Sequence, residues 1–178
     1  MSTGAVPRLR HKRRDATPFF FEAYSGYQAK LAAGFATLGV RTDGEFLTGI
    51  EYLPASAGAL DPQNRLAEEV VAQLKAYLDD PRFSFDLPIR LSGTPFQREV
   101  WAAIQSIASG GTLTYFELAK QVYSSPRAVG QACGANSLPI VIPCHRVVAK
   151  QGLGGFMNSR GDDALAIKRW LLTHESGR

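Results

Sequence analysis

Residues 137–148, SLPIVIPCHRVV, form the segment of the chain that could do chemistry. In it an apolar run leads to Cys144, His145 and Arg146. A cysteine is nucleophilic as the thiolate, and a nearby imidazole can accept the thiol proton. Neighbouring residues of an extended segment point to opposite faces, so we expect a water to bridge the thiol and the ring. The alternative is a structural cysteine, because free cysteine is among the most buried residue types.

Helices are expected to surround this segment. The sequence predicts helices over 96–109, 115–122, 126–135 and 164–175. Thr94 and Pro95 are a typical helix start, and Thr114 with Glu117 forms a capping box. A short helix, a tight turn and a helix of small residues are typical of a helix-turn-helix, although many such pairs only pack together. We therefore expect a mostly helical C-terminal domain over residues 93–178.

Strands are predicted in the first half of the chain. Residues 30–40 and 46–53 are expected to pair as a hairpin through the turn at 42–44. A helix is expected from an Asn64 cap to just before Pro81, followed by a strand over 83–91. We expect an α/β domain over residues 17–92, preceded by a basic tail over 1–16.

Composition limits the class of protein. The chain has 178 residues, of which 45% are hydrophobic and 20% charged, which is typical of a soluble globular protein rather than a disordered chain. No apolar run approaches the roughly 18 residues of a membrane span. Two cysteines exclude a disulfide framework and a four-thiolate zinc site, and a free thiol suits the cytoplasm.

Charge is segregated along the chain. Residues 1–14 hold five basic residues and no acid, residues 15–96 are acidic on balance, and residues 97–150 hold five basic and two acidic residues. This pattern indicates a polyanionic partner for the tail and the second half. A short basic tail can equally be a solvated segment without a partner.

The motif PCHRVV at 143–148 resembles the active-site signature of the O6-alkylguanine-DNA alkyltransferases, also called methylated-DNA–protein-cysteine methyltransferases. The resemblance covers about residues 95–175. It extends upstream through Tyr115, RAVG at 127–130 and Asn136, and downstream to KRWLLTHE, which ends at Glu175. It implies a ribonuclease-H-like N-terminal α/β domain and a winged-helix-like C-terminal domain that carries the helix-turn-helix.

The resemblance implies DNA repair by a single-turnover suicide enzyme. Cys144 would take a methyl or other alkyl group irreversibly from O6 of guanine, with O4 of thymine as a second candidate atom. No cofactor and no metal are expected, the partner is double-stranded DNA, and we expect a monomer without membrane attachment. His145 would take the thiol proton through a water, and Glu175 would orient the imidazole. Asn136 would brace the active-site turn, and Tyr115 would donate toward the departing guanine.

The remaining site residues implied by the resemblance bind DNA and the damaged base. A damaged base within a duplex must be flipped out to be reached. Arg127 would fill the vacated stack from a helix that enters the minor groove. The other expected DNA-binding residues are Ala128, Gly130, Thr94 and Gln97. The expected substrate-binding residues are Pro139, which packs on the base, Val147, whose carbonyl accepts the exocyclic amine with that of Cys144, and Phe156, Met157 and Ser159.

The loop at 154–163 departs from the family pattern. Phe156 stands where many members have tyrosine, so no phenol is expected there. The Met157 backbone N–H is expected to contact the substrate oxygen, with Ser159 as the weaker candidate.

Two rival functions remain open at this stage. One is a lesion-binding protein without chemistry, and the other is a cysteine hydrolase that uses Cys144 and His145. The cysteine argues against the first rival. The direct adjacency of the two residues and the lack of an evident oxyanion loop argue against the second.

Overall fold

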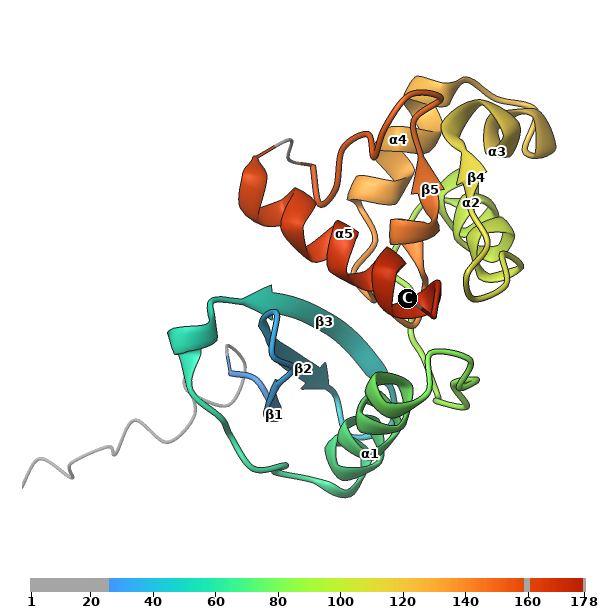
Figure 1. Ribbon diagram of the computed structural model, residues 1–178. Helices are drawn as coiled ribbons and strands as arrows, with labels where there is room; N and C mark the ends of the chain where they lie inside the picture. Colours follow the sequence, from blue (N-terminus) through green and yellow to red (C-terminus); the bar gives the residue numbers. More distant parts are fainter. Residues whose placement is uncertain (1–25, 159–160, 178) are drawn as a thin grey trace, which may run out of the picture.

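A computed structural model describes residues 26–158 and 161–177 of the chain. Its N-terminal part is a three-stranded antiparallel sheet in the order β1-β2-β3, with α1 packed against it (Figure 1). The strands are β1 (Ala29–Ala32), β2 (Thr37–Thr42) and β3 (Leu47–Leu53), followed by a short 3₁₀ turn, η1 (Ala55–Ala57). The single strand expected over 30–40 is wrong, because Gly34 takes a φ of +80° and turns the chain between β1 and β2.

Helix α1 (Arg65–Asp79) begins where the sequence predicts. The Asn64 side chain accepts a hydrogen bond from the Ala67 backbone N–H at 2.8 Å, which satisfies one of the free donors of the first turn. The face that this helix buries against the sheet consists of Leu66, Ala67, Val70, Leu74 and Tyr77. Tyr77 lies at its far end, where the helix approaches the C-terminal part of the chain.

The strand expected over 83–91 is absent. This segment makes one isolated bridge, between Ile89 and Leu47. Leu47 donates to the Pro88 carbonyl and accepts from the Arg90 N–H. Proline has no N–H to donate, so the ladder cannot extend past residue 88.

The C-terminal part is mostly helical. It contains α2 (Pro95–Gln105), α3 (Tyr115–Gln121), α4 (Pro126–Gly134) and α5 (Asp162–Glu175), with the 3₁₀ turn η2 (Cys144–Arg146) between α4 and α5. The two short strands β4 (Leu113–Thr114) and β5 (Val147–Val148) pair in parallel beside them. The Thr94 N-cap and the Thr114 capping box are confirmed, and the Gln97 side chain makes the Thr94 cap a capping box as well.

Two of these helices differ from the expected bounds. Helix α2 ends at Gln105 rather than near residue 109, because the Ser106 side chain and the Ile107 N–H bond back to carbonyls of the last turn. Helix α5 begins at Asp162, so Asp162 and Asp163 belong to its first turn rather than to a longer loop. Two carboxylates there are stabilised by the positive end of the helix dipole.

The sheet and the C-terminal helices meet along β3 and α5. Figure 1 shows α5 on the side of the helical part that faces the sheet. The ring of Phe35 stacks on Trp170 of α5 with centroids 4.1 Å apart. The Ile50 N–H of β3 donates to the Ser137 carbonyl at 2.8 Å. Across the described ranges, no helix is long and apolar enough to cross a membrane.

Candidate active site

The turn that carries Cys144 is held from behind by Asn136. The Asn136 side chain donates to the Ile142 carbonyl at 2.8 Å and accepts from the Leu138 N–H at 2.9 Å. These bonds fold residues 136–142 back on themselves, and η2 begins two residues later, at Cys144. The expectation of an extended segment is wrong here, because Cys144, His145 and Arg146 occupy one 3₁₀ turn.

The Cys144 thiol is almost fully buried, with 6% of the residue exposed. Burial raises the pKa of this thiol, and the Asn136 side chain and the Lys168 charge offset only part of that effect. The thiol is therefore protonated at neutral pH. A base must remove the proton before the sulfur can act as a nucleophile.

His145 is positioned to be that base. It is completely buried, and its Nε2 lies 2.8 Å from Oε1 of Glu175. Burial lowers the pKa of His145 more than the Glu175 carboxylate raises it, so the ring is neutral at rest. Because the carboxylate only accepts, Nε2 carries the hydrogen and Nδ1 is the acceptor.

The acceptor nitrogen of His145 has no hydrogen-bond partner in the described ranges. No hydrogen bond joins the thiol directly to the ring there either, as the sequence predicts, although the reason is the 3₁₀ turn. The side chains of neighbouring residues on such a turn diverge by about a third of a revolution.

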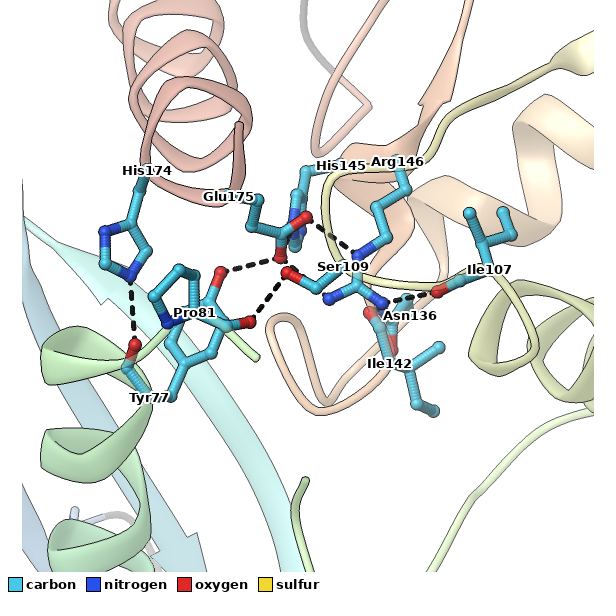
Figure 2. Close-up of polar contacts among 10 residues, drawn as sticks. All are labelled: Tyr77, Pro81, Ile107, Ser109, Asn136, Ile142, His145, Arg146, His174 and Glu175. Carbon is cyan, nitrogen blue, oxygen red and sulfur yellow. Dashed lines mark hydrogen bonds and ion pairs between the residues drawn. The ribbon is translucent and has the colours of Figure 1, made fainter. Parts of the chain in front are cut away.

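Glu175 lies at the centre of a buried cluster (Figure 2). Arg146 donates to both of its oxygens, from Nε at 2.9 Å and from Nη2 at 2.8 Å, and the Tyr77 hydroxyl donates at 2.8 Å. Burial acts to raise the pKa of Glu175, but the hydrogen bonds from His145 and Arg146 and the charge of Arg146 outweigh it and lower the pKa to about 2. The carboxylate is thus ionised and fixed in place before any reaction.

Two cavities meet at Cys144. The larger, about 540 Å³, is lined by residues that include Tyr115, Arg127, Gly130, Gly134, Phe156 and Met157. The smaller, about 170 Å³, is lined by residues that include Ile50, Tyr52, Asn136, Pro139 and Met157. The sulfur is therefore reached from the α4 side and from the sheet side.

Comparisons with known proteins agree with this arrangement. The model of the 6-O-methylguanine DNA methyltransferase DNA binding domain matches residues 95–177. The methylated-DNA–protein-cysteine methyltransferase of Archaeoglobus fulgidus is 41% identical over 108 residues, covering 60% of this chain and 74% of that protein. The chain belongs to the O6-methylguanine DNA methyltransferase family. It is a methylated-DNA–protein-cysteine methyltransferase, which performs DNA alkylation repair, as the resemblance implies.

Solved structures of family members have the same fold. The O6-methylguanine methyltransferase of Mycobacterium tuberculosis matches with a TM-score of 0.71 and 31% identity, covering 86% of this chain and 93% of that one. The structure of that organism's protein in complex with DNA matches with a TM-score of 0.68 and 31% identity, over 83% of this chain and 91% of the other.

The structure brings most of the residues expected from the family together at the cavities. Arg127 is exposed at the start of α4, while Phe156 is buried. The Tyr115 hydroxyl donates to the Gly155 carbonyl at 3.1 Å. Met157 has a φ of +53°, and its side chain is 42% exposed.

Other expected site residues line neither cavity, already have partners, or lie outside the described ranges. Thr94 and Gln97 bond to each other's backbone in the α2 capping box and line neither cavity. The Val147 carbonyl accepts from Lys168 Nζ at 2.6 Å. Ser159 lies outside the described residues.

Lys168 is a site residue that the sequence reasoning missed. It is completely buried on α5 and donates to the carbonyls of Val147 and Gly155. Burial lowers its pKa to about 8, against the opposite effect of the two cysteines. A signal for it was available, because Lys168, Leu171 and Glu175 recur at i, i+3 and i+7, which is one face of a helix.

Proposed function

We propose that this methyltransferase repairs O6-alkylated guanine by a single displacement on the sulfur of Cys144. The observation that carries the proposal is the free Nδ1 of His145, next along the chain to a protonated thiol and fixed by the ionised Glu175. The thiol proton moves to His145, a sulfur–carbon bond forms, and the carbon–O6 bond breaks. Guanine leaves as an anion and regains a proton, and the thioether is not turned over. By the same step, O4-alkylated thymine is a second substrate.

The other residues of the cluster support this step. Glu175 stabilises the imidazolium once it forms, as the acid of a hydrolase triad does. Asn136 holds the turn and faces the sulfur. Tyr115, which lines the larger cavity, donates toward the departing base. No cofactor takes part in this scheme.

The damaged base enters from the α4 side. In this proposal α3 and α4 form the helix-turn-helix of a winged-helix-like domain, and the small residues Ala128 and Gly130 let α4 approach the minor groove. Arg127 fills the stack, and the start of α2 at Thr94 and Gln97 contacts the backbone. The N-terminal part is a ribonuclease-H-like domain that ends near residue 92, and the protein acts as a cytoplasmic monomer.

The base is then held at the junction of the two cavities. Pro139 packs against it, and Phe156 closes the opposite side. The Met157 N–H donates to the substrate oxygen, a role that Ser159 can share. The carbonyls of Cys144 and Val147 accept the exocyclic amine; a carbonyl oxygen has two lone pairs, so Val147 can serve both Lys168 and the base.

Intact mass after reaction with a duplex that contains O6-methylguanine tests the proposal. We expect one added methyl group per molecule, and none in Cys144→Ser. Cys133→Ser is the matched control, because the Cys133 thiol is also buried and its pKa is raised to about 12. Methylation of the Cys144→Ser variant would refute the assignment of the acceptor.

The same mixture separates the rival functions. A hydrolase would restore many lesions per molecule and leave the protein mass unchanged. A lesion-binding protein would bind the duplex and leave both the lesion and the protein mass unchanged. Only stoichiometric loss of the lesion together with gain of mass agrees with the proposal.

A further inference from the structure

Tyr123 is the most exposed large hydrophobic residue of the described ranges, at 97%. It lies in the turn between α3 and α4 and has a φ of +48°. The residue after a helix end that takes such a φ is commonly glycine, and a bulky residue there is rare because its Cβ is strained. The tyrosine therefore strains the backbone, and its ring contributes no packing to the fold.

The turn is bonded on both sides of Tyr123. The Ser124 N–H donates to the Ala119 carbonyl at 2.8 Å, which closes the end of α3. The Ser125 hydroxyl accepts from the Ala128 N–H at 3.2 Å and caps α4. The surrounding structure thus holds the strained residue in place with its ring in solvent, and strain that is held in this way is typical of functional sites.

Two exposed residues of α3 extend the surface that Tyr123 begins. Phe116 is 55% exposed, and the Lys120 ammonium lies 4.6 Å from the centroid of its ring. Phe116, Lys120 and Tyr123 follow one another at intervals of four and three residues, the spacing of neighbours on a helix. We call these three residues the α3 surface. It presents two aromatic rings with a cation between them.

The charge around the α3 surface suits a phosphate backbone. Lys120 and Arg127 are exposed cations, whereas the Glu117 carboxylate is engaged by the N–H and the hydroxyl of Thr114. Arg127, four residues after Tyr123, lines the larger cavity. Figure 1 shows α3 and α4 side by side on the part of the helical region that lies away from the sheet. The α3 surface therefore continues the face from which the larger cavity opens.

We propose that the α3 surface contacts the sugar–phosphate backbone of the duplex beside the damaged base. This inference rests on the proposed function, in which α3 and α4 meet the DNA. The Tyr123 hydroxyl donates to a phosphate oxygen while its ring lies against the deoxyribose, and Lys120 pairs with a neighbouring phosphate. Contacts of this kind position a protein on a duplex and do not read its sequence.

Tyr123→Ala and Tyr123→Gly separate the contact from the strain. Both variants lack the ring, but only glycine relieves the positive φ. We expect each variant to bind duplex about tenfold more weakly than wild type, the effect of one hydrogen bond to a charged acceptor. The loss should be equal for methylated and undamaged duplex, because the contact is to the backbone. The urea midpoint should rise in Tyr123→Gly alone.

Salt dependence distinguishes the two contacts of the α3 surface. Tyrosine releases no counterion, so Tyr123→Ala should keep the wild-type slope of log Kd against log salt concentration. Lys120→Ala should reduce the size of that slope by about 0.9, the value for one phosphate. Lys75→Ala, at an exposed position on α1, is the matched control and should keep the wild-type affinity and slope. Fluorescence anisotropy of a labelled duplex measures these quantities.

Wild-type affinity in Tyr123→Ala would overturn the proposal, as would a loss confined to methylated duplex. Wild-type affinity together with a changed sedimentation coefficient would assign the α3 surface to contacts between protein molecules instead. If wild-type protein gains no methyl group but the variants lose duplex affinity as described, the proposed function fails and this contact stands.

Discussion

Glu175 joins the two parts of the chain through one carboxylate. It accepts from His145 and Arg146 in the C-terminal part and from Tyr77, 98 residues earlier on α1. Because the hydrogen bonds from all three residues favour the ionised form, the residue that orients the base also contributes to the stability of the fold.

We predict that Glu175→Gln lowers the free energy of unfolding by about 3 kcal/mol, because it leaves the largely buried Arg146 guanidinium, 12% exposed, without a charged partner. The pKa of Glu175 is lowered to about 2 in the folded protein, against about 4.3 in an unfolded chain. Its contribution is therefore fully present above pH 4.3 and is lost as the pH falls toward 2. Urea unfolding between pH 7 and pH 2 measures both effects.

Glu99→Gln, at an exposed position beyond the first turn of α2, is the control and should behave as wild type. An acid transition of the same steepness in Glu175→Gln and wild type would contradict the assignment of this titration to Glu175.

At the scale of elements, the loop before α5 is fastened to the end of α4. Asn158 donates from Nδ2 to the Gly134 carbonyl at 3.0 Å and has a φ of +55°, which asparagine tolerates better than most residues. A Cβ at position 134 would overlap the Asn158 carboxamide. The glycine at position 134 is thus explained by contact with this loop.

We predict that Gly134→Ala destabilises the protein by no more than about 1 kcal/mol, because the exposed Asn158 carboxamide can turn away from the new Cβ at the cost of its hydrogen bond to the Gly134 carbonyl. Asn158→Gly removes the carboxamide and suits the positive φ, so it should restore most of that loss in the double variant. Thermal unfolding of the four proteins gives the coupling energy. Additive effects would show that the two positions do not interact.

The sequence predicted helices better than strands. Side-chain caps at Asn64, Thr94 and Thr114 are local signals, and each marks a helix start in the structure. Residues 83–91 have the composition of a strand, but Pro88 has no backbone N–H to donate, so the bridge at Ile89 does not extend toward residue 83. Whether a segment finds such a partner depends on contacts far away in the chain.

The same limit applies to the site. Cys144, His145 and Glu175 lie in motifs and were predicted. Tyr77 and Tyr52 come from the other half of the chain, where neither periodicity nor a motif distinguishes them from core residues.

At the scale of the whole molecule, DNA is expected to meet one face only. The larger cavity opens beside Arg127 and α4, whereas residues 15–96, which are acidic on balance, contribute the sheet on the other side of Cys144. Repair of a duplex and reaction with a free base should therefore depend on different residues. Only in the duplex does the flipped base leave a gap in the base stack that a side chain must fill.

We predict that Arg127→Ala slows repair of methylated duplex by about tenfold or more, because flipping a base costs a few kcal/mol of stacking that the guanidinium replaces. Reaction with free O6-benzylguanine should change little. Single-turnover rates on both substrates measure this, with the exposed Arg82→Ala as the control. An equal loss of rate on both substrates would show that Arg127 does not fill the base stack.

The Phe35–Trp170 stack has an optical consequence. The chain contains two tryptophans. Trp101 is buried in the helical part and donates to the Ala132 carbonyl, whereas Trp170 lies between Phe35 of the sheet and His174, whose ring stacks 5.0 Å away. With Trp101 replaced by phenylalanine, the remaining emission would come from the junction alone. The fluorescence of this Trp101→Phe variant would therefore report, without an attached dye, whether the sheet and the helices stay in contact while Cys144 is alkylated.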